Sequence, residues 1–280
     1  MVQSIAVCGA GTMGSGIALV AAQAGFSTIQ FDLNEAALEK SKQGITAQLT
    51  KLVQKEKIKA AEMDSILARI HFTNQMNDCK ANLIIEAIIE DLPIKQNLFK
   101  QLYSINAKDT IYASNTSSIS IDAIADELDF AENIVGMHFF NPAPIMKLVE
   151  IIKGKQTLPV IVEQIVVLTK QLGKVPVVCK DAPGFIVNRV ARHFYLESME
   201  MVSRGLISIE QADGLMEAAG FKMGPFKLMD LIGLDINYSV SKIVWESLGK
   251  PARLQPAHLQ KEKVTNGDLG KKTGKGFYTY

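Results

Sequence analysis

Short, continuous apolar runs alternate with longer segments of helical periodicity over the first two thirds of the chain. "SIAVCGAG" begins the series as a buried strand that enters a glycine turn. "SGIALVAAQAG" then has the pattern of a helix that ends at Gly25, and "STIQFD" reads as a second strand. Strand, helix and strand in this order predict a parallel β-α-β unit. The chain is therefore expected to open with an α/β fold.

The next segment, from Glu35 to about Arg69, has the periodicity of a helix. Its apolar positions at core-facing spacing are Leu38, Ile45, Leu49 and Leu52. The segment is long for one helix of a globular protein, so we expect two helices that form a hairpin turning near Lys57.

Five further apolar runs predict the remaining strands of a mostly parallel sheet. They are "ANLIIEAI", "TIYASNT", "NIVGMHFF", "MKLVEII" and "VPVVCKD", and the helical segment "LPVIVEQIVVLTKQLG" separates the last two.

After "DAPGF" the pattern changes, and strand signals disappear until the last few residues. The segments "FIVNRVARHFYLESMEMVSRG", "SIEQADGLMEAAG" and "KLMDLIGLDINYSVSKIVWESLG" all have helical periodicity. We therefore predict an α/β domain with a helical hairpin insertion over residues 1–182 and an all-α domain over residues 183–280. The helical part contains Met199, Met201, Met216, Met223 and Met229. These side chains either fill its core or form a subunit interface.

Composition narrows the function classes. The chain has 280 residues, 48% of them hydrophobic and 21% charged, with a formal net charge of +1. Nothing in this balance favours binding to nucleic acid or to an acidic membrane. Three widely spaced cysteines without a CxxC pattern predict neither a disulfide framework nor a metal site. The N-terminus shows no signal or transit peptide and no run could span a bilayer, so a cytoplasmic location is the simplest expectation.

A glycine motif follows the first strand. The sequence Gly9-Ala-Gly11-Thr12-Met13-Gly14 fits G-x-G-x-x-G, opens a helix, and precedes Asp32 at the end of the second strand. Gly9 allows the tight turn, Gly11 lets the backbone approach a pyrophosphate, and Gly14 lets helix and strand pack closely. Asp32 can accept hydrogen bonds from ribose hydroxyls and would repel a 2′-phosphate. The motif therefore predicts a dinucleotide site that prefers NAD to NADP.

Hydride transfer to a nicotinamide needs a group that manages a proton, and histidine suits this role near neutral pH. The chain has four, at His71, His138, His193 and His258. His71 lies at a strand edge, His193 in a helix and His258 in a polar stretch, so an ordinary structural role is favoured for these three.

His138 lies at the C-terminal end of a predicted strand, where open α/β sheets bind their ligands. Glu150 follows twelve residues later and shares strand parity with Leu148 and Ile152, so its carboxylate is expected to point inward. A buried carboxylate is costly unless it is paired, and an imidazole is a natural partner. From the residues alone, an acid–base pair and two unrelated residues both stay open.

Two other polar groups lie near predicted strand or domain ends. "SNTSSISI" offers hydroxyls and an amide at Ser114–Ser118, where helix capping is the ordinary explanation. "DAPGFIVNR" places Asn188 on a helix just past the domain boundary, where it is either a solvated residue or faces a cleft between the domains.

The chain resembles the L-3-hydroxyacyl-CoA dehydrogenases, especially the short bacterial 3-hydroxybutyryl-CoA dehydrogenases. The stretches that carry the resemblance span nearly the whole chain in one order: "VCGAGTMGSGIA", "EAIIEDLPIKQNLF", "ASNTSSISI", "GMHFFNPAPIMKLVEII", "CKDAPGFIVNR", "MGPFKLMDLIGLD" and "GKKTGKGFYTY". The resemblance implies a Rossmann-like domain, a helical domain and a homodimer formed mainly by the latter. It also implies reversible NAD-dependent oxidation of the 3-hydroxyl of an acyl-CoA.

Residue roles follow from the resemblance. His138 matches the catalytic base, Glu150 its electrostatic partner, Ser117 the serine near the reacting oxygen, and Asn188 the cleft asparagine. The implied cofactor contacts beyond the glycine motif are Glu90, Lys95, Asn115, Asn141 and Lys275. In the implied reaction His138 accepts the hydroxyl proton while hydride leaves C3 of the substrate.

Coenzyme A requires its own contacts. Lys51 and Lys55 lie one helical turn apart, and on charge alone they form either a solvated face or an anion site. The family places CoA near this hairpin, which favours the anion site. Gln48 departs from the pattern, because some family members have a CoA-contacting serine there.

Two alternatives compete with this interpretation. One is a dehydrogenase of small free 3-hydroxy acids, but those families use a catalytic lysine and need no CoA site. The other is a nucleotide-binding relative without activity, and the presence of His138, Glu150 and Asn188 argues against it.

Overall fold

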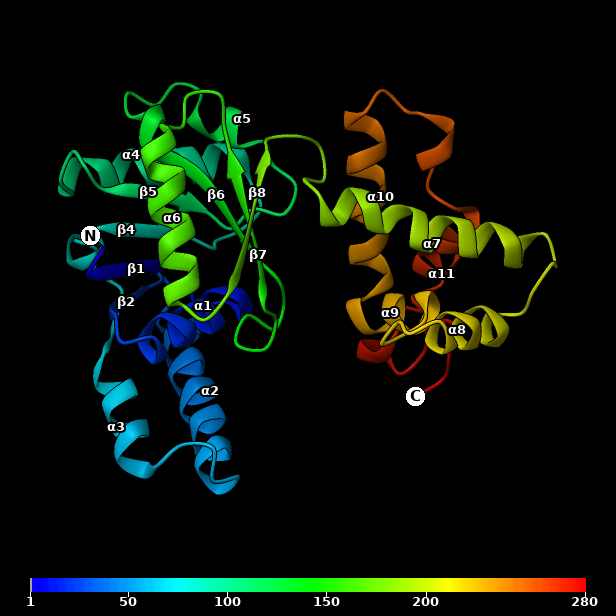
Figure 1. The fold of residues 1–280 in the computed structure, drawn as a ribbon, viewed down its shortest axis with the longest axis horizontal. Coiled ribbons are helices and arrows are strands. Elements are labelled where there is room, and N and C mark those ends of the chain that lie inside the picture. Colours follow the sequence, from blue (N-terminus) through cyan, green and yellow to red (C-terminus); the bar gives the residue numbers. More distant parts are fainter. Residues whose placement is uncertain (1) are drawn as a thin grey trace. The chain divides into compact units, whose positions relative to one another are not determined.

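The computed structural model describes residues 2–280, which form two compact units, the first ending at Asp181 and the second beginning at Ala182 (Figure 1). The first unit is an α/β structure and the second is built from helices. This confirms the predicted Rossmann-like fold followed by a helical part.

One eight-stranded sheet forms the centre of the first unit, in the order β3-β2-β1-β4-β5-β6-β7-β8. Strands β1 to β6 run parallel, β7 is antiparallel to β6, and β8 is parallel to β7. The strands are β1 Ser4–Cys8, β2 Ser27–Phe31, β3 Ile70–Thr73, β4 Leu83–Glu86, β5 Ile111–Ser114, β6 Ile134–Phe139, β7 Leu148–Lys153 and β8 Val175–Lys180. The parallel arrangement brings the C-terminal ends of β1, β2, β4, β5 and β6 to one edge.

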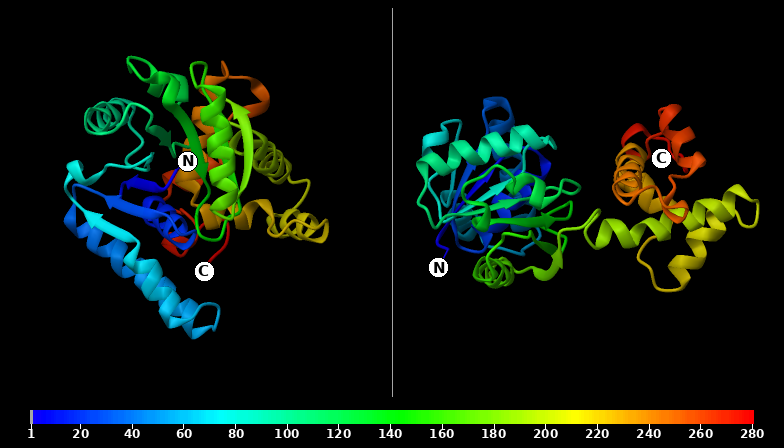
Figure 2. Two further views of the ribbon diagram at one scale, coloured as in Figure 1. Left: turned by 60° about the vertical axis from the view of Figure 1, so that its left-hand side comes forward. Right: turned by 90° about the horizontal axis from the view of Figure 1, so that it is seen from above.

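Six helices accompany the sheet among the described residues: α1 Thr12–Gln23, α2 Glu35–Gln54, α3 Ala60–Ala68, α4 Leu92–Ile105, α5 Ile121–Ala125 and α6 Pro159–Gln171. The helices α2 and α3 lie side by side and extend beyond the sheet (Figures 1 and 2). The chain turns between them through residues 55–59, so the predicted hairpin is confirmed.

The helix α1 connects two parts of the core. Ile17 and Ala21 pack against apolar side chains of the strands, such as Val7 and Ile85. On another side of the helix, Leu19 joins the cluster formed by α2, α3 and β3. Ile45, Leu49 and Ile66, all buried, complete this second cluster. The spacing of the apolar residues along α2 thus packs the α2–α3 hairpin against α1, the helix that follows the glycine motif.

The second unit contains α7 Val187–Ser203, α8 Ile209–Ala218, α9 Pro225–Ile232, α10 Leu234–Ser247 and α11 His258–Thr265. Its core includes Met199, Phe226 and Met229, which are fully buried. The other three methionines of this unit are half-buried. Met199 and Met229 therefore fill the core, which is the first of the two roles predicted for the five methionines.

Three details differ from the expected elements. Strand β3 was expected only as the strand edge at His71, without bounds, and the helix α11 was not expected, because each element is short and carries a weak apolar pattern. The long segment expected as one helix after Lys227 is two helices, since Gly233 has φ +103° and ends α9. A positive φ is open to glycine and strained for other residues.

The C-terminal segment is fixed to the helices by two buried carboxylates. Asp230 accepts hydrogen bonds from the backbone N–H groups of Phe277 and Tyr278, both at 2.9 Å. Asp213 accepts from the Tyr278 hydroxyl at 2.7 Å. Within residues 2–280, no helix has the length and apolar character needed to cross a membrane.

Candidate active site

The glycine turn after β1 has the geometry that a dinucleotide requires. Gly9 has φ +111°, and a Cβ there would lie 2.5 Å from the carbonyl oxygen of Ala87. A Cβ on Gly14 would overlap the carbonyl oxygen of Gly9, whereas one on Gly11 would have no atom within 4 Å. The backbone at Gly11 is thus open to a ligand, and the N-terminus of α1 begins beside it. Backbone N–H groups at such a terminus stabilise phosphate.

Asp32 is connected to this turn by hydrogen bonds. Its Oδ2 accepts from the backbone N–H of Ala10 at 2.7 Å, and its Oδ1 accepts from Asn34 N at 2.9 Å. The half-buried carboxylate therefore has a fixed position directly after β2. The open glycine turn fits the pyrophosphate of NAD, and the anchored carboxylate beside it fits the hydroxyl groups of the adenosine ribose.

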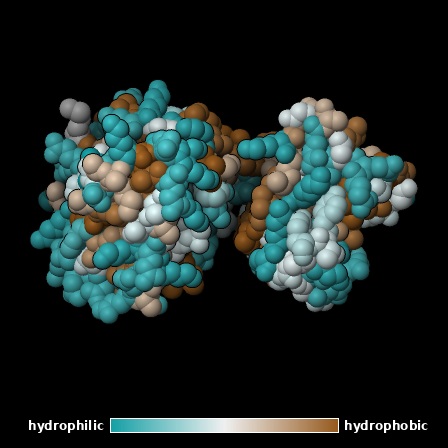
Figure 3. All heavy atoms as spheres, turned by 90° about the horizontal axis from the view of Figure 1, so that it is seen from below, coloured by the Kyte–Doolittle hydropathy of each residue, from teal (hydrophilic) through white to brown (hydrophobic). Residues whose placement is uncertain are grey.

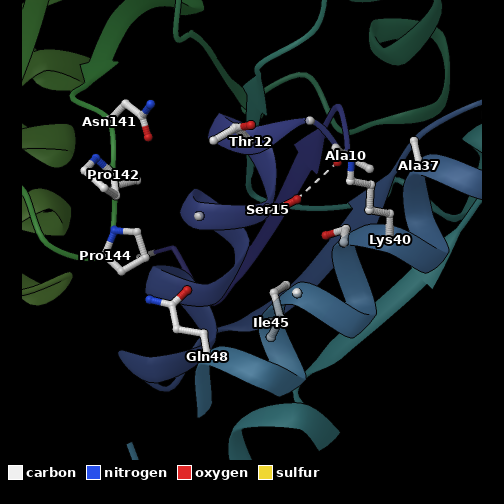
Figure 4. A pocket seen from close by; sticks show the side chains of 15 residues that line it. Ala10, Thr12, Ser15, Ala37, Lys40, Ile45, Gln48, Asn141, Pro142 and Pro144 are labelled. Carbon is white, nitrogen blue, oxygen red and sulfur yellow. Dashed lines mark hydrogen bonds between the residues drawn. The ribbon is translucent and has the colours of Figure 1, made fainter. Parts of the chain in front are cut away.

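A pocket of about 460 Å³ opens beside the turn, between three segments of the first unit. The first is the start of α1 with Thr12 and Ser15, the second is α2 with Lys40 and Gln48, and the third is the segment 141–144 (Figure 4). Ser15 Oγ donates to the carbonyl oxygen of Ala10 at 3.1 Å within this wall. The pocket therefore joins the predicted cofactor contacts at the glycine turn and Asn141 with the predicted CoA contact Gln48.

His138 and Glu150 lie directly opposite each other on the antiparallel strands β6 and β7. His138 Nδ1 is 2.8 Å from Glu150 Oε2. His138 is 6% exposed and Glu150 is 0% exposed, and the ring of Phe140 packs 4.5 Å from the imidazole. The expected inward parity of Glu150 thus places its carboxylate on the histidine ring. Because both strands belong to the sheet, the geometry of this pair is set by backbone register.

The loop after β5 lies beside this pair. Asn115 Oδ1 accepts a hydrogen bond from the backbone N–H of Phe139 at 2.8 Å, which joins the end of β5 to the end of β6. Ser117 is half-buried two residues later. Asn115 and Ser117 therefore occupy the same sheet edge as His138.

One acid holds most of this loop in place. Oε1 of Glu90 accepts from Thr116 Oγ1 at 2.5 Å, Ser117 N at 3.1 Å and Ser118 Oγ at 2.8 Å. Burial acts to raise the pKa of Glu90, but the Lys95 ammonium and the two hydroxyl groups outweigh it and lower the pKa below its usual value. Glu90 is therefore an ionised anchor for the segment that contains Ser117.

Lys95 is buried between two carboxylates. Its Nζ lies 2.6 Å from Glu86 Oε1 and 3.2 Å from Glu90 Oε2, and its side chain is 1% exposed. Glu86 is 0% exposed and also accepts from Ser114 Oγ at 2.6 Å. Glu86 was not among the predicted site residues. The signal was present, since it is a lone acid in the apolar run "LIIEAI", as Glu150 is in "KLVEII".

The predicted CoA lysines lie at the C-terminal end of α2. Lys51 and Lys55 are exposed, as are Lys57 and Lys59 in the turn that follows. No ion pair with a carboxylate joins any of the four within residues 2–280. Residues 51–59 contain these four lysines and one acid, Glu56, so this stretch carries a net positive charge on a chain of nearly zero net charge.

Asn188 and Lys275 belong to the helical unit. Asn188 is half-buried in the first turn of α7, and its carbonyl oxygen accepts from Arg192 Nε at 2.9 Å. Lys275 is exposed and lies 3.2 Å from Asp268. The two therefore lie in a different compact unit from His138 and Glu150.

The other histidines lie outside this constellation. His71 is exposed on β3 at 3.6 Å from Asp78, and His193 and His258 line a surface pocket of the helical unit. No group of metal-ligating side chains is found in the described part of the chain. The three cysteines are free thiols.

The chain matches two family models that together cover nearly its whole length. Residues 4–182 match the NAD binding domain of 3-hydroxyacyl-CoA dehydrogenase, and residues 184–280 match the C-terminal domain of the same family.

Curated relatives and solved structures agree with these matches. A 3-hydroxyadipyl-CoA dehydrogenase of Escherichia coli K12 is 44% identical over all of this chain, which spans 59% of that relative. A probable 3-hydroxybutyryl-CoA dehydrogenase of Deinococcus radiodurans is 41% identical, with 98% of this chain and 99% of the relative covered. The crystal structure of (S)-3-hydroxybutyryl-CoA dehydrogenase from Ralstonia eutropha has a TM-score of 0.96 at 38% identity, covering 100% and 99% of the two chains.

Proposed function

The chain belongs to the 3-hydroxyacyl-CoA dehydrogenase family, and we propose that it catalyses reversible oxidation of the 3-hydroxyl group of a short L-3-hydroxyacyl-CoA. NAD is the cofactor, since the N-terminal match is to an NAD binding domain. The observation that carries the proposal is the buried contact between His138 and Glu150 at the ligand edge of the sheet.

The glycine turn and Asp32 would hold the cofactor. Gly11, Thr12 and Met13 present backbone N–H groups at the start of α1 to the pyrophosphate. Asp32 accepts from the adenosine ribose and disfavours a 2′-phosphate by charge repulsion. NAD bound in this way supplies the hydride acceptor.

His138 acts as the general base in oxidation and as the general acid in reduction. Glu150 binds Nδ1, which fixes the tautomer, so the substrate hydroxyl proton passes to Nε2. The imidazolium formed in this step is stabilised by the neighbouring carboxylate, which the fold keeps out of water. The pair therefore moves one proton at one defined nitrogen.

Ser117 donates a hydrogen bond to the reacting oxygen, and Glu90 holds the backbone of Ser117 for this purpose. Asn188 positions the substrate. Glu90, Lys95, Asn115 and Asn141 maintain the edge of the sheet at which the cofactor binds, and Lys275 is a further cofactor contact.

Coenzyme A binds along α2. Gln48 lies in the pocket beside the glycine turn, and Lys51 and Lys55 continue the same helix toward its exposed end. Their ammonium groups attract the phosphates of CoA, which a free hydroxy acid lacks. The unpaired positive surface thus favours a CoA thioester over a free acid.

We propose a homodimer formed through the helical unit. Figure 3 shows hydrophobic residues among hydrophilic ones on the surface. Several large apolar side chains of the helical unit are exposed. They include Leu206, Leu215, Phe221 and Leu231, each at least 50% exposed. Sedimentation at micromolar concentration should give the mass of a dimer, and a monomer would contradict this proposal. We also propose a cytoplasmic location for the protein.

One assay tests the proposed activity. NADH oxidation is followed at fixed enzyme concentration with acetoacetyl-CoA and, in parallel, with free acetoacetate. Turnover with the thioester alone supports the proposal. Equal turnover of the free acid would support a free-acid dehydrogenase, and no turnover of either would support a binding protein. A 3-ketoadipyl-CoA arm tests the substrate class in the name of the Escherichia coli relative.

A further inference from the structure

Lys174 is a buried cation that the proposed mechanism does not use. It lies between α6 and β8, is 7% exposed, and forms no ion pair with a carboxylate in the described part of the chain. Burial, together with the charge of Lys147, lowers the pKa of its ammonium group below the usual value. A charge held away from water is costly unless its donors are satisfied.

The acceptors of Lys174 are two backbone carbonyls of a single loop. Its Nζ donates to the carbonyl oxygen of Ala143 at 2.5 Å and to that of Met146 at 2.8 Å. The next residue, Val175, donates its backbone N–H to the carbonyl oxygen of Lys147 at 2.8 Å. Lys174 and the first residue of β8, Val175, thus bind the loop between β6 and β7 through three of its carbonyl oxygens, those of residues 143, 146 and 147.

This loop has little apolar packing of its own. Ile145 and Met146 are 67% and 41% exposed, and Ala143 is its one fully buried apolar side chain among the described residues. The backbone of α1 approaches it at Gly16, where a Cβ would lie 3.1 Å from Cβ of Ala143 and 3.2 Å from Cδ of Pro144. The loop is therefore held between α1 on one side and Lys174 on another.

The same loop forms a wall of the pocket beside the glycine turn. The pocket-lining residues Asn141, Pro142, Ala143 and Pro144 face the start of α1 and the side of α2 (Figure 4). The loop also joins β6, which contains His138, to β7, which contains Glu150. A shift of the loop would change the width of the pocket while the strand register keeps the His138–Glu150 contact.

We propose that Lys174 is a positioning residue for the cofactor pocket, whose ammonium group fixes the loop 141–147 through the carbonyls of Ala143 and Met146. The proposal rests on the proposed function in that the pocket takes NAD. Lys174 touches neither cofactor nor substrate, so its effect is on cofactor affinity and not on the chemical step.

The test compares four proteins: wild type, K174M, K174R and the control K170M. Methionine keeps the length of the side chain and removes the charge and all donors. Lys170 is an exposed lysine at the end of α6, four residues away, so K170M removes a nearby charge without touching the loop. Thermal melting first establishes that each variant is folded, and K174Q replaces K174M if the latter is not.

NADH affinity is then measured by fluorescence titration, which needs no acyl-CoA turnover. We expect Kd for NADH to rise roughly tenfold in K174M, to rise less in K174R, and to stay at the wild-type value in K170M. The kcat for acetoacetyl-CoA at saturating NADH should stay within about threefold of wild type, which separates affinity from chemistry.

Several results would overturn the inference. An unchanged Kd for NADH in a folded K174M would do so, as would a large loss of kcat with Kd unchanged. Failure of both K174M and K174Q to fold would show a purely structural role and would also overturn it. A wild-type protein that does not bind NADH would instead contradict the proposed function itself.

Discussion

The α/β unit holds its charges in two contrasting ways. At the ligand edge of the sheet, Glu86, Lys95, His138 and Glu150 are buried and meet partners at 2.6–2.8 Å. At the far end of α2, the lysines from Lys51 to Lys59 are exposed and have no carboxylate partner in the described part of the chain.

The buried pairs and the exposed lysines suit two different functions. A buried pair has its geometry set by the fold, because each charge would be costly without its partner. Such a pair suits chemistry at one atom. Exposed cations are mobile and screened by salt over about 8–10 Å at physiological ionic strength. They suit attraction of a charged ligand, and substitutions there should have smaller and salt-dependent effects.

The largest effect is expected for His138→Ala. The substitution removes the proton acceptor, so kcat for acetoacetyl-CoA reduction should fall roughly 10²–10⁴-fold, the usual range for general acid–base catalysis. NADH affinity should hold, because the glycine turn and Asp32 are untouched. Near-normal activity in a folded variant would show that the buried pair is not the catalytic one.

Glu90→Gln should have the next largest effect. It removes the charge that binds Thr116, Ser117 and Ser118 and leaves Lys95 with one partner fewer. We expect kcat to fall about 10- to 100-fold through misplacement of Ser117. A matched variant, Glu127→Gln, alters an exposed acid paired with Lys100 and should leave kcat unchanged.

The pH dependence sharpens this expectation. Because the pKa of Glu90 is lowered in the fold, its ionic contacts are present above the unfolded value near 4.5 and are lost as pH falls through the lower folded value. Between about pH 5 and 8 the wild type should therefore show no loss of activity from Glu90. A Glu90-dependent step in the neutral range, absent in Glu90→Gln, would contradict the assignment.

Asp32 is intermediate between the two groups, since it is half-buried and hydrogen-bonded to the glycine turn. Asp32→Gly should narrow the preference for NADH over NADPH by about tenfold, which corresponds to about 1.4 kcal/mol. The measurement is kcat/KM with each cofactor. A wild type that uses NADPH as well as NADH would contradict the predicted charge repulsion.

The exposed lysines should give the smallest effect. The double substitution Lys51→Glu and Lys55→Glu should raise KM for acetoacetyl-CoA about fivefold at low salt, because each exposed ion pair contributes about 0.2–1 kcal/mol. The effect should shrink as salt is added, and NADH binding should stay nearly constant. The control is the double substitution Lys108→Glu and Lys170→Glu, which changes the net charge by the same amount elsewhere on the α/β unit. An unchanged KM at low salt would locate CoA elsewhere.

The sequence pattern accounted for much of the fold through local signals. The glycine turn was predicted from the spacing of its glycines. The helical hairpin and most of the strands were predicted from the pattern of apolar residues. The parity of Glu150 likewise indicated an inward carboxylate, and the register of β6 and β7 places it opposite His138.

Features that depend on distant packing were not readable in the same way. Lys174 follows the end of α6 by two residues, Leu172 and Gly173, and only the fold brings it to the carbonyls of Ala143 and Met146. Glu86 had a signal in its apolar surroundings, but its partner Lys95 is nine residues away on α4. Helix α11 has too little amphipathic pattern to separate it from a polar loop.

A double-mutant cycle at His138 and Glu150 tests the central claim most directly. The four proteins are wild type, His138→Ala, Glu150→Gln and the double variant, each shown to be folded, and kcat for acetoacetyl-CoA reduction is measured at saturating NADH. If the two side chains act as one unit, the double variant should be little slower than His138→Ala alone. Strictly additive losses would contradict the account, because Glu150 would then act independently of the histidine.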